Sequence, residues 1–252
     1  MKNTLGVIPA RMASSRFPGK PLKKILNIPM LAHCYERALL SGVCDNLVIA
    51  TPDQEIIDWA TQFEIPSVLT SHSHKRATER AKETLDILTN DGLHYDLVLL
   101  LQGDEPQIFP EDIGNLKQAF SNNELDVVNL VFPISDDGLE NPNIVKVALD
   151  KNLTIHFFSR SHIPHDCISG YRQLGMIGLT KKALNNYVSL PPTSLEEVES
   201  IDMMRLIEND FSIQGVLSTS PILGVDTQQD LKKVEKIMTN DKFVNLYKEK
   251  YI

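Results

Sequence analysis

The stretch LGVIPARMASSRFPGKPL, residues 5–22, predicts both the fold class and the position of a ligand site. Residues 5–8 form a short apolar run, which indicates a buried β-strand. The following loop, residues 10–20, is polar and carries the cations Arg11, Arg16 and Lys20. In open α/β sheets, ligands bind beyond the carboxyl ends of the strands. We therefore expect this loop to bind an anionic ligand, and the alternative is a solvated basic loop with no ligand.

Two known phosphate-binding motifs do not fit this loop. A dinucleotide fingerprint needs GxGxxG, whereas the loop contains only Gly19. A P-loop needs GxxxxGK[ST], but Ser14 replaces its first glycine and Pro21 replaces its hydroxyl residue. The groups left to bind phosphate are the cationic side chains and the backbone N–H groups near Ser14, Ser15 and Gly19.

The first half of the chain alternates between strand and helix patterns. Further strands are predicted at residues 46–50, 66–69 and 96–101. Helices are predicted at residues 30–42, 53–63 and 77–88, with Asp53 as an N-cap. This order is typical of a parallel sheet covered by helices on both faces.

After Pro110 the pattern changes. Strand-like runs follow one another closely at residues 126–131, 144–149 and 154–158, and helices are expected at residues 181–187, 195–208 and 228–238. We therefore expect one domain over residues 1–252, with an α/β fold, a mixed but mostly parallel sheet and a small β-rich lobe at about residues 126–180.

Charge and composition exclude several classes of function. The chain has 252 residues, with 25 Lys plus Arg against 33 Asp plus Glu, a net charge of −8. Such a chain is a poor candidate for binding nucleic acid or an anionic membrane. No window approaches the roughly 18 apolar residues that span a bilayer, and the N-terminus lacks a signal-peptide core, so we expect a cytoplasmic protein.

Cysteine and histidine patterns give no support to a structural metal site. Three cysteines (Cys34, Cys44 and Cys167) are widely spaced and show no CxxC motif, which argues against a disulfide framework and a structural zinc site. Two His pairs, at residues 72 and 74 and at residues 162 and 165, resemble zinc ligands, but we interpret them as parts of partly exposed loops.

Carboxylates follow two apolar stretches. Asp104 and Glu105 come directly after the strand predicted at residues 96–101, and Asp226 follows the apolar stretch at residues 213–223. Mg²⁺ binds in proteins through one or two carboxylates together with substrate phosphate oxygens. With the basic loop, these residues indicate a Mg²⁺–nucleotide site, and the alternative for Asp226 is a turn residue or a helix N-cap.

Five ordered motifs resemble those of the CMP-Kdo synthetase family, the 3-deoxy-manno-octulosonate (Kdo) cytidylyltransferases. The family patterns are IPAR-x-x-S-x-R-x-PGKPL, QGDEP, NP-x-x-VKV, FSR-x-x-IP and GVDT. They match residues 8–22, 102–106, 141–147, 158–164 and 224–227. The resemblance runs nearly end to end and implies a Rossmann-like nucleotidyltransferase fold. It also implies a reaction in which CTP and a sugar acid give a CMP-sugar and pyrophosphate, in a homodimer that serves lipopolysaccharide synthesis.

The resemblance also implies roles for individual residues. It places Ala10, Arg11, Ser14, Arg16, Lys20, Arg76, Thr78 and Arg80 at the nucleotide, and Gln102, Arg160, Gln173 and Asp202 at the sugar acid. In the same way, Asp104 and Asp226 would hold Mg²⁺, and Lys20, Arg16 and Asp104 would be the catalytic residues. Arg160 would pair with the carboxylate of the acid.

The chain departs from the family pattern at both substrates. Arg76-Ala77 stands where the family has Ser-Gly, which affects the expected recognition of cytosine. At residues 173–179 a histidine and two tyrosines of the family pattern are absent, and Asp202 replaces a glutamate. Lost hydrogen-bonding groups predict a smaller or less hydroxylated acceptor than Kdo, and the alternative is repacking of Ile177 and Leu179 behind the site.

Three hypotheses of function follow. The first is Mg²⁺-dependent transfer of CMP from CTP to Kdo or a related 3-deoxy-ulosonic acid. The second is the same transfer to another small acid, such as a different ulosonic acid or a phosphonate. The third is a nucleotide-binding protein that has lost catalysis.

Overall fold

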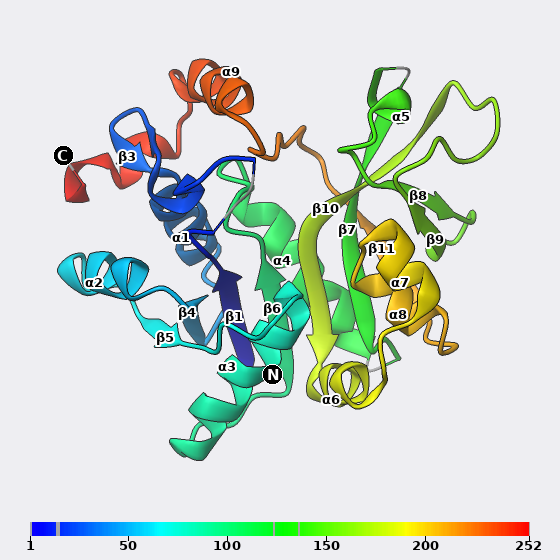
Figure 1. Ribbon diagram of the computed structural model, residues 1–252, viewed down its shortest axis with the longest axis horizontal. Coiled ribbons are helices and arrows are strands. Elements are labelled where there is room, and N and C mark those ends of the chain that lie inside the picture. The colour runs from blue at the N-terminus through cyan, green and yellow to red at the C-terminus, as the bar shows by residue number, and fades with distance from the viewer. Residues whose placement is uncertain (1, 14–15, 123, 136, 252) are drawn as a thin grey trace. The chain divides into compact units, whose positions relative to one another are not determined.

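The computed structural model describes residues 2–13, 16–122, 124–135 and 137–251, and it divides into two compact units (Figure 1). The first unit consists of Met1–Gly114 and Ile222–Ile252, and the second is Asn115–Pro221. The boundary falls inside helix α4 (Pro110–Gln118). No helix in the described residues is long and apolar enough to cross a membrane.

The first unit contains a parallel sheet of four strands in the order β5-β4-β1-β6. Its strands are β1 (Thr4–Pro9), β4 (Asn46–Thr51), β5 (Ser67–Leu69) and β6 (Leu97–Leu101), with a hairpin of β2 (Lys24–Ile25) and β3 (Ile28–Pro29). Its helices are α1 (Met30–Leu40), α2 (Gln54–Gln62), α3 (Ala77–Asn90) and α9 (Gln228–Met238), with short 3₁₀ helices at Lys20–Leu22, Val244–Leu246 and Lys248–Lys250. These elements confirm every strand and helix predicted for residues 5–101 and the helix at residues 228–238.

The central strands of this sheet are buried because helices cover them. Every residue of β6 is buried, as expected for a continuous apolar strand of a parallel sheet. Parallel pairing brings the carboxyl ends of β1, β4 and β6 to one edge, where Pro9 lies opposite Ala50. Loops that follow these three strands therefore share that edge.

The second unit is built mainly from five strands in the order β10-β7-β11-β9-β8, in which β8 also pairs with β10. Its strands are β7 (Val127–Ser135), β8 (Lys146–Leu149), β9 (Thr154–Ser159), β10 (Ser169–Thr180) and β11 (Ile213–Leu217). Its helices are α5 (Asp137–Glu140), α6 (Lys181–Ser189), α7 (Ser194–Glu199) and α8 (Met203–Ile207), with a 3₁₀ helix at Ala119–Asn122. Among the described strands of this unit, β7 and β11 pair in parallel and the other pairings are antiparallel. The protein therefore contains both strand orientations, as expected for a mixed sheet.

The single helix predicted at residues 195–208 is wrong. The structure has two short helices there, α7 and α8, because Ser200 adopts a left-handed conformation with φ 57°. The carbonyl of Glu199 consequently accepts from Arg160 Nε at 2.9 Å, and not from a backbone N–H of a following helical turn.

Helix α4 and strand β10 were not predicted from the sequence, and neither were the β2–β3 hairpin and α5. Helix α4 begins at Pro110 and has Glu111 and Asp112 in its first turn, the signals of a helix N-terminus. Strand β10 is long but contains three glycines, and its pairing with β7 shifts register between Gln173 and Ile177. Glycine lowers strand propensity, and this irregularity explains why the segment carried no clear strand pattern.

Candidate active site

The basic loop after β1 is tied to the first unit at several points. The backbone N–H of Met12 donates to Asp53 Oδ2 at 2.7 Å, and Gly19 N–H donates to the carbonyl of Met12 at 3.1 Å. Phe17 is buried in the same apolar cluster as Val225 and anchors the middle of the loop. Asp53 precedes α2, but its side chain does not cap the helix and binds the loop instead.

Lys20 lies between the two carboxylates predicted to hold metal. Its Nζ donates to Asp104 Oδ2 at 2.7 Å and to the carbonyl of Val225 at 2.8 Å, and lies 3.6 Å from Asp226 Oδ1. Arg16 Nη2 donates to the same Asp226 oxygen at 3.1 Å. Loop cations and strand-end carboxylates therefore meet at one point, although their residues are up to 210 positions apart.

The backbone also fixes the relative position of the two carboxylates. Val225 N–H donates to the carbonyl of Asp104 at 2.9 Å, which joins the two loops. Gly103 allows a close approach, because a Cβ there would lie 2.9 Å from the carbonyl oxygen of Pro9 and 3.1 Å from Leu31. The N-cap of α9 is Thr227, whose side chain accepts from Asp230 N–H at 3.2 Å, so the N-cap alternative for Asp226 is wrong.

These groups line a cavity of about 310 Å³ in the first unit. Of the described residues that line it, six are Lys or Arg and two are Asp. The predicted site residues among them are Ala10, Arg11, Arg16, Lys20, Arg76, Arg80, Gln102, Asp104 and Asp226. The cavity is therefore strongly cationic inside a chain of net charge −8, as a polyphosphate ligand requires.

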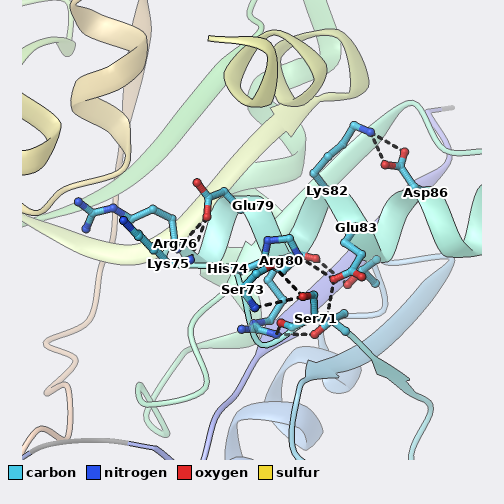
Figure 2. Close-up of polar contacts among 12 residues, drawn as sticks. Ser71, Ser73, His74, Lys75, Arg76, Glu79, Arg80, Lys82, Glu83 and Asp86 are labelled. Carbon is cyan, nitrogen blue, oxygen red and sulfur yellow. Dashed lines mark hydrogen bonds and ion pairs between the residues drawn. The ribbon is translucent and has the colours of Figure 1, made fainter. Parts of the chain in front are cut away.

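The segment before α3 forms a further wall of the cavity and is held by acidic residues of that helix (Figure 2). Glu79 Oε2 accepts from the backbone N–H groups of Lys75 and Arg76 at 3.0 and 3.2 Å. Glu83 Oε2 lies 2.6 Å from His74 Nε2 and accepts from Ser71 N–H at 2.8 Å. Two carboxylates thus fix the wall of the cavity that contains Arg76 and Ala77, the pair that replaces the Ser-Gly of the family pattern.

Arg80 and Thr78, on the same helix, are placed differently. Arg80 is buried, and its guanidinium donates to the Thr70 hydroxyl and to the Ser71 carbonyl. Burial, and secondarily the charge of Arg11, lower the pKa of Arg80. Thr78 is fully buried and does not line the cavity. Ser14, the remaining predicted nucleotide residue, lies outside the described residues.

Three predicted sugar residues belong to the second unit. Arg160 follows β9, and its Nε and Nη1 donate to the carbonyls of Glu199 and Pro142 at 2.9 and 3.3 Å. Gln173 Nε2 donates to Asn129 Oδ1 at 2.6 Å. Asp202 lies at the start of α8 and is half-buried.

Asn129 is a residue that the sequence did not single out. It is fully buried, and its Nδ2 donates to the carbonyls of Leu174 and Met176 at 2.9 and 3.1 Å, inside the irregular part of β10. Ile177 and Leu179 are buried in the core of the unit, which supports repacking at these two positions.

The histidine pairs are parts of hydrogen-bonded loops. His162 Nδ1 lies 2.6 Å from Glu140 Oε1, and His165 Nε2 lies 3.3 Å from Asp166 Oδ2 at the surface. Within the described parts of the chain, no group of three or more His, Cys, Asp or Glu side chains could hold a metal ion. A metal at Asp104 and Asp226 would therefore need ligands from substrate or water.

Comparison with known proteins shows which family this chain resembles. The cytidylyltransferase family model matches residues 5–216. The 3-deoxy-manno-octulosonate cytidylyltransferase of Thermodesulfovibrio yellowstonii is 39% identical over 249 residues, covering 93% of this chain and 98% of that protein. The enzyme of the same name from Acidobacterium capsulatum is 36% identical over 245 residues, covering 95% and 98%.

Solved structures agree with the sequence comparison. A CMP:2-keto-3-deoxy-manno-octonic acid synthetase complexed with CTP is 33% identical, with a TM-score of 0.85 over 95% of this chain and 99% of that one. A glucose-1-phosphate thymidylyltransferase from Bacillus anthracis has a TM-score of 0.70 at 17% identity over 96% and 99% of the two chains, and shows the shared nucleotidyltransferase fold alone. Because the family model spans most of the chain and relatives at 36% and 39% identity align over nearly their whole length, this protein belongs to the cytidylyltransferase family.

Proposed function

We propose that this protein transfers CMP from CTP to 3-deoxy-manno-octulosonate and releases pyrophosphate. The main structural support for the proposal is the close approach of Lys20, Asp104 and Asp226 in a cavity lined by cations. Such a cavity suits a triphosphate, and the two carboxylates suit the metal that accompanies it. The relatives named as Kdo cytidylyltransferases support the choice of acid and of base.

The carboxylates fit a divalent cation such as Mg²⁺. Asp104 and Asp226 already direct oxygens at one cationic group, the Lys20 ammonium, and both side chains are about one-third exposed. Hard carboxylate oxygens are the ligands that Mg²⁺ prefers, and phosphate oxygens and water would complete its coordination. When bound there, the metal would neutralise charge on the reacting phosphates.

Cationic side chains supply the rest of the chemistry. An acceptor hydroxyl attacks the α-phosphorus of CTP, the bond to the bridging oxygen breaks, and the hydroxyl proton passes to solvent. Negative charge accumulates on the departing pyrophosphate, and Lys20 and Arg16 are placed to stabilise it. Arg11, Arg76 and Arg80, which also line the cavity, would hold the nucleotide in position for in-line attack.

We assign the sugar acid to Gln102, Arg160, Gln173 and Asp202. Gln102 lines the cavity of the first unit, and the other three lie in the second. On this proposal both units serve one cytidylyltransferase domain, and Ser14 and Thr78 assist nucleotide binding from the basic loop and from α3. We also propose a cytoplasmic homodimer in lipopolysaccharide synthesis, and light scattering on the purified protein tests the dimer.

A substrate screen tests the proposed function. Purified protein is incubated with Mg²⁺, each of the four nucleoside triphosphates in turn, and a panel of acids that includes Kdo, other ulosonic acids and phosphonates. We expect pyrophosphate release with CTP and Kdo together, and much less with any other pair. Preference for another acid would establish the second hypothesis, and CTP binding without turnover on any acid would establish loss of catalysis.

A further inference from the structure

Lys146, at the start of β8, is a fully buried lysine with three backbone partners. Its Nζ donates to the carbonyls of Asn141 and Ile144, each at 2.9 Å, and to the carbonyl of Arg160. An ammonium group has three hydrogens, so all three are used. Lys146 therefore joins the segment before β8 to the backbone of Arg160.

Glu199, at the end of α7, holds Arg160 from another side. Its Oε2 accepts from Arg160 N–H at 2.8 Å, its Oε1 accepts from the Ser159 hydroxyl at 2.9 Å, and its carbonyl accepts from Arg160 Nε. The left-handed conformation of Ser200 ends α7 directly after Glu199, which makes this carbonyl available. The backbone N–H, the backbone carbonyl and the side chain of Arg160 are thus all fixed.

Two of the three nitrogens of the Arg160 guanidinium are held by hydrogen bonds. Its Nε and Nη1 donate to backbone carbonyls, and no carboxylate of the described residues forms an ion pair with it. Nη2 has no hydrogen-bond partner among those residues. An arginine fixed in this way keeps the N–H groups of Nη2 for a carboxylate ligand.

Charge in this cluster is arranged around Arg160. Burial, and secondarily the positive charge of Arg160, lower the pKa of Lys146, while Glu140 and Glu199 act in the opposite direction. Two cations lie close together here because each is held by hydrogen bonds to oxygen. Burying a lysine ammonium costs much free energy unless all its hydrogen bonds are made. The need to keep all three hydrogen bonds makes the arrangement rigid.

We propose that Lys146 and Glu199 are positioning residues, which fix Arg160 so that its Nη2 group donates to the carboxylate of the acceptor acid. The inference rests on the proposed function, since it assigns the acid to Arg160. Neither residue touches substrate on this account, and both act through Arg160. Their loss should therefore affect binding of the acid and leave binding of CTP nearly unchanged.

The test measures KM for the acid and KM for CTP in matched variants. Lys146→Met and Glu199→Gln should each raise KM for the acid at least tenfold and change KM for CTP less than twofold. Matched controls are Lys182→Met and Glu197→Gln, which change residues of the same kinds in the same unit and should leave both constants unchanged. Glu199 is only partly buried, so its variant decides the outcome if Lys146→Met does not fold.

A double-mutant cycle tests action through Arg160. In an Arg160→Gln background, Glu199→Gln should add less than twofold to KM for the acid, because the group that it positions is already absent. The inference would be overturned if the effects of Arg160→Gln and Glu199→Gln on KM for the acid multiplied in the double variant. It would also be overturned if the single variants changed both KM values equally, or left KM for the acid unchanged. An inactive wild-type protein would overturn the proposed function itself, whereas an active wild type with unaffected variants would overturn only the positioning roles.

Discussion

The ammonium of Lys20 lies 2.7 Å from a carboxylate oxygen of Asp104, so a cation of the basic loop forms an ion pair with a carboxylate at the end of β6. Asp226 is the second carboxylate within reach of the same ammonium, at 3.6 Å. The charge balance at this point depends on all three residues, because the Lys20 ammonium partly compensates both carboxylates. We therefore expect a change in any one of them to alter both metal binding and phosphate binding.

Asp104→Asn tests the carboxylate. The variant keeps the size of the side chain but removes its charge, so we expect Mg²⁺-dependent turnover to fall by at least about 100-fold. Asp58→Asn, on the exposed face of α2, is the matched control and should retain full activity. Near-normal turnover of Asp104→Asn across a Mg²⁺ titration would remove Asp104 from the metal site.

Lys20→Met tests the cation. We expect kcat to fall by about 10²–10³-fold, as for other groups that stabilise charge developing in the transition state. The dissociation constant of CTP, measured by calorimetry, should rise much less, because several other cations line the cavity. Weaker binding of CTP with an unchanged kcat would mean that Lys20 contributes to ground-state binding alone.

Gly19→Ala tests the shape of the basic loop. Gly19 has φ 71°, and an L-residue in the left-handed region costs roughly 1–2 kcal/mol. Gly42 has φ 65°, and a Cβ added there would meet no atom within 4 Å, so Gly42→Ala carries a similar backbone cost far from Lys20. We expect both variants to lose similar thermal stability, whereas only Gly19→Ala loses turnover. Equal loss of turnover in both variants would show that turnover does not depend specifically on the conformation of the basic loop at Gly19.

His33 predicts a pH dependence of stability. Burial lowers the pKa of this histidine to about 4, and its ring nitrogens lie 2.7 Å from the Tyr247 hydroxyl and 2.9 Å from the Ile25 carbonyl. Between pH 6.5 and 4 the unfolded state binds more protons than the folded state, so stability is fully present above pH 6.5 and falls as the pH drops towards 4. At pH 5 this one group should reduce the free energy of unfolding by about 2 kcal/mol relative to pH 7.5.

Denaturant unfolding of the wild type and His33→Gln at the two pH values measures this contribution. The wild type should lose about 2 kcal/mol more than the variant between pH 7.5 and pH 5, because the glutamine does not titrate. An identical pH dependence of both proteins would show that His33 is not the responsible group.

Local patterns were enough to predict the centre of the site. Residues 5–22 combine a buried strand with a basic loop, and Asp104 follows a second apolar strand, so strand-end geometry alone brings them to one edge of the sheet. Asp226 belongs to the same site for a different reason, because its loop is joined to Asp104 by a backbone hydrogen bond from Val225. Only the resemblance of its GVDT motif distinguished it from an N-cap.

Contacts between distant residues could not be predicted in this way. Asp53 has the sequence signature of an N-cap, yet its carboxylate binds Met12 N–H, 41 positions away. Lys146 is an ordinary lysine in the sequence, and only the fold gives it three carbonyl partners. Helical periodicity continued through Ser200, because a single left-handed residue changes the path of the chain without changing the apolar spacing.

The most direct test of the account is product identification with the wild-type protein, CTP, Mg²⁺ and Kdo. Mass spectrometry and a pyrophosphate assay on the same reaction should find CMP-Kdo and pyrophosphate in equal amounts, with neither formed when the acid or the metal is omitted. Binding of CTP without any CMP-sugar, or release of phosphate in place of pyrophosphate, would contradict the assignment.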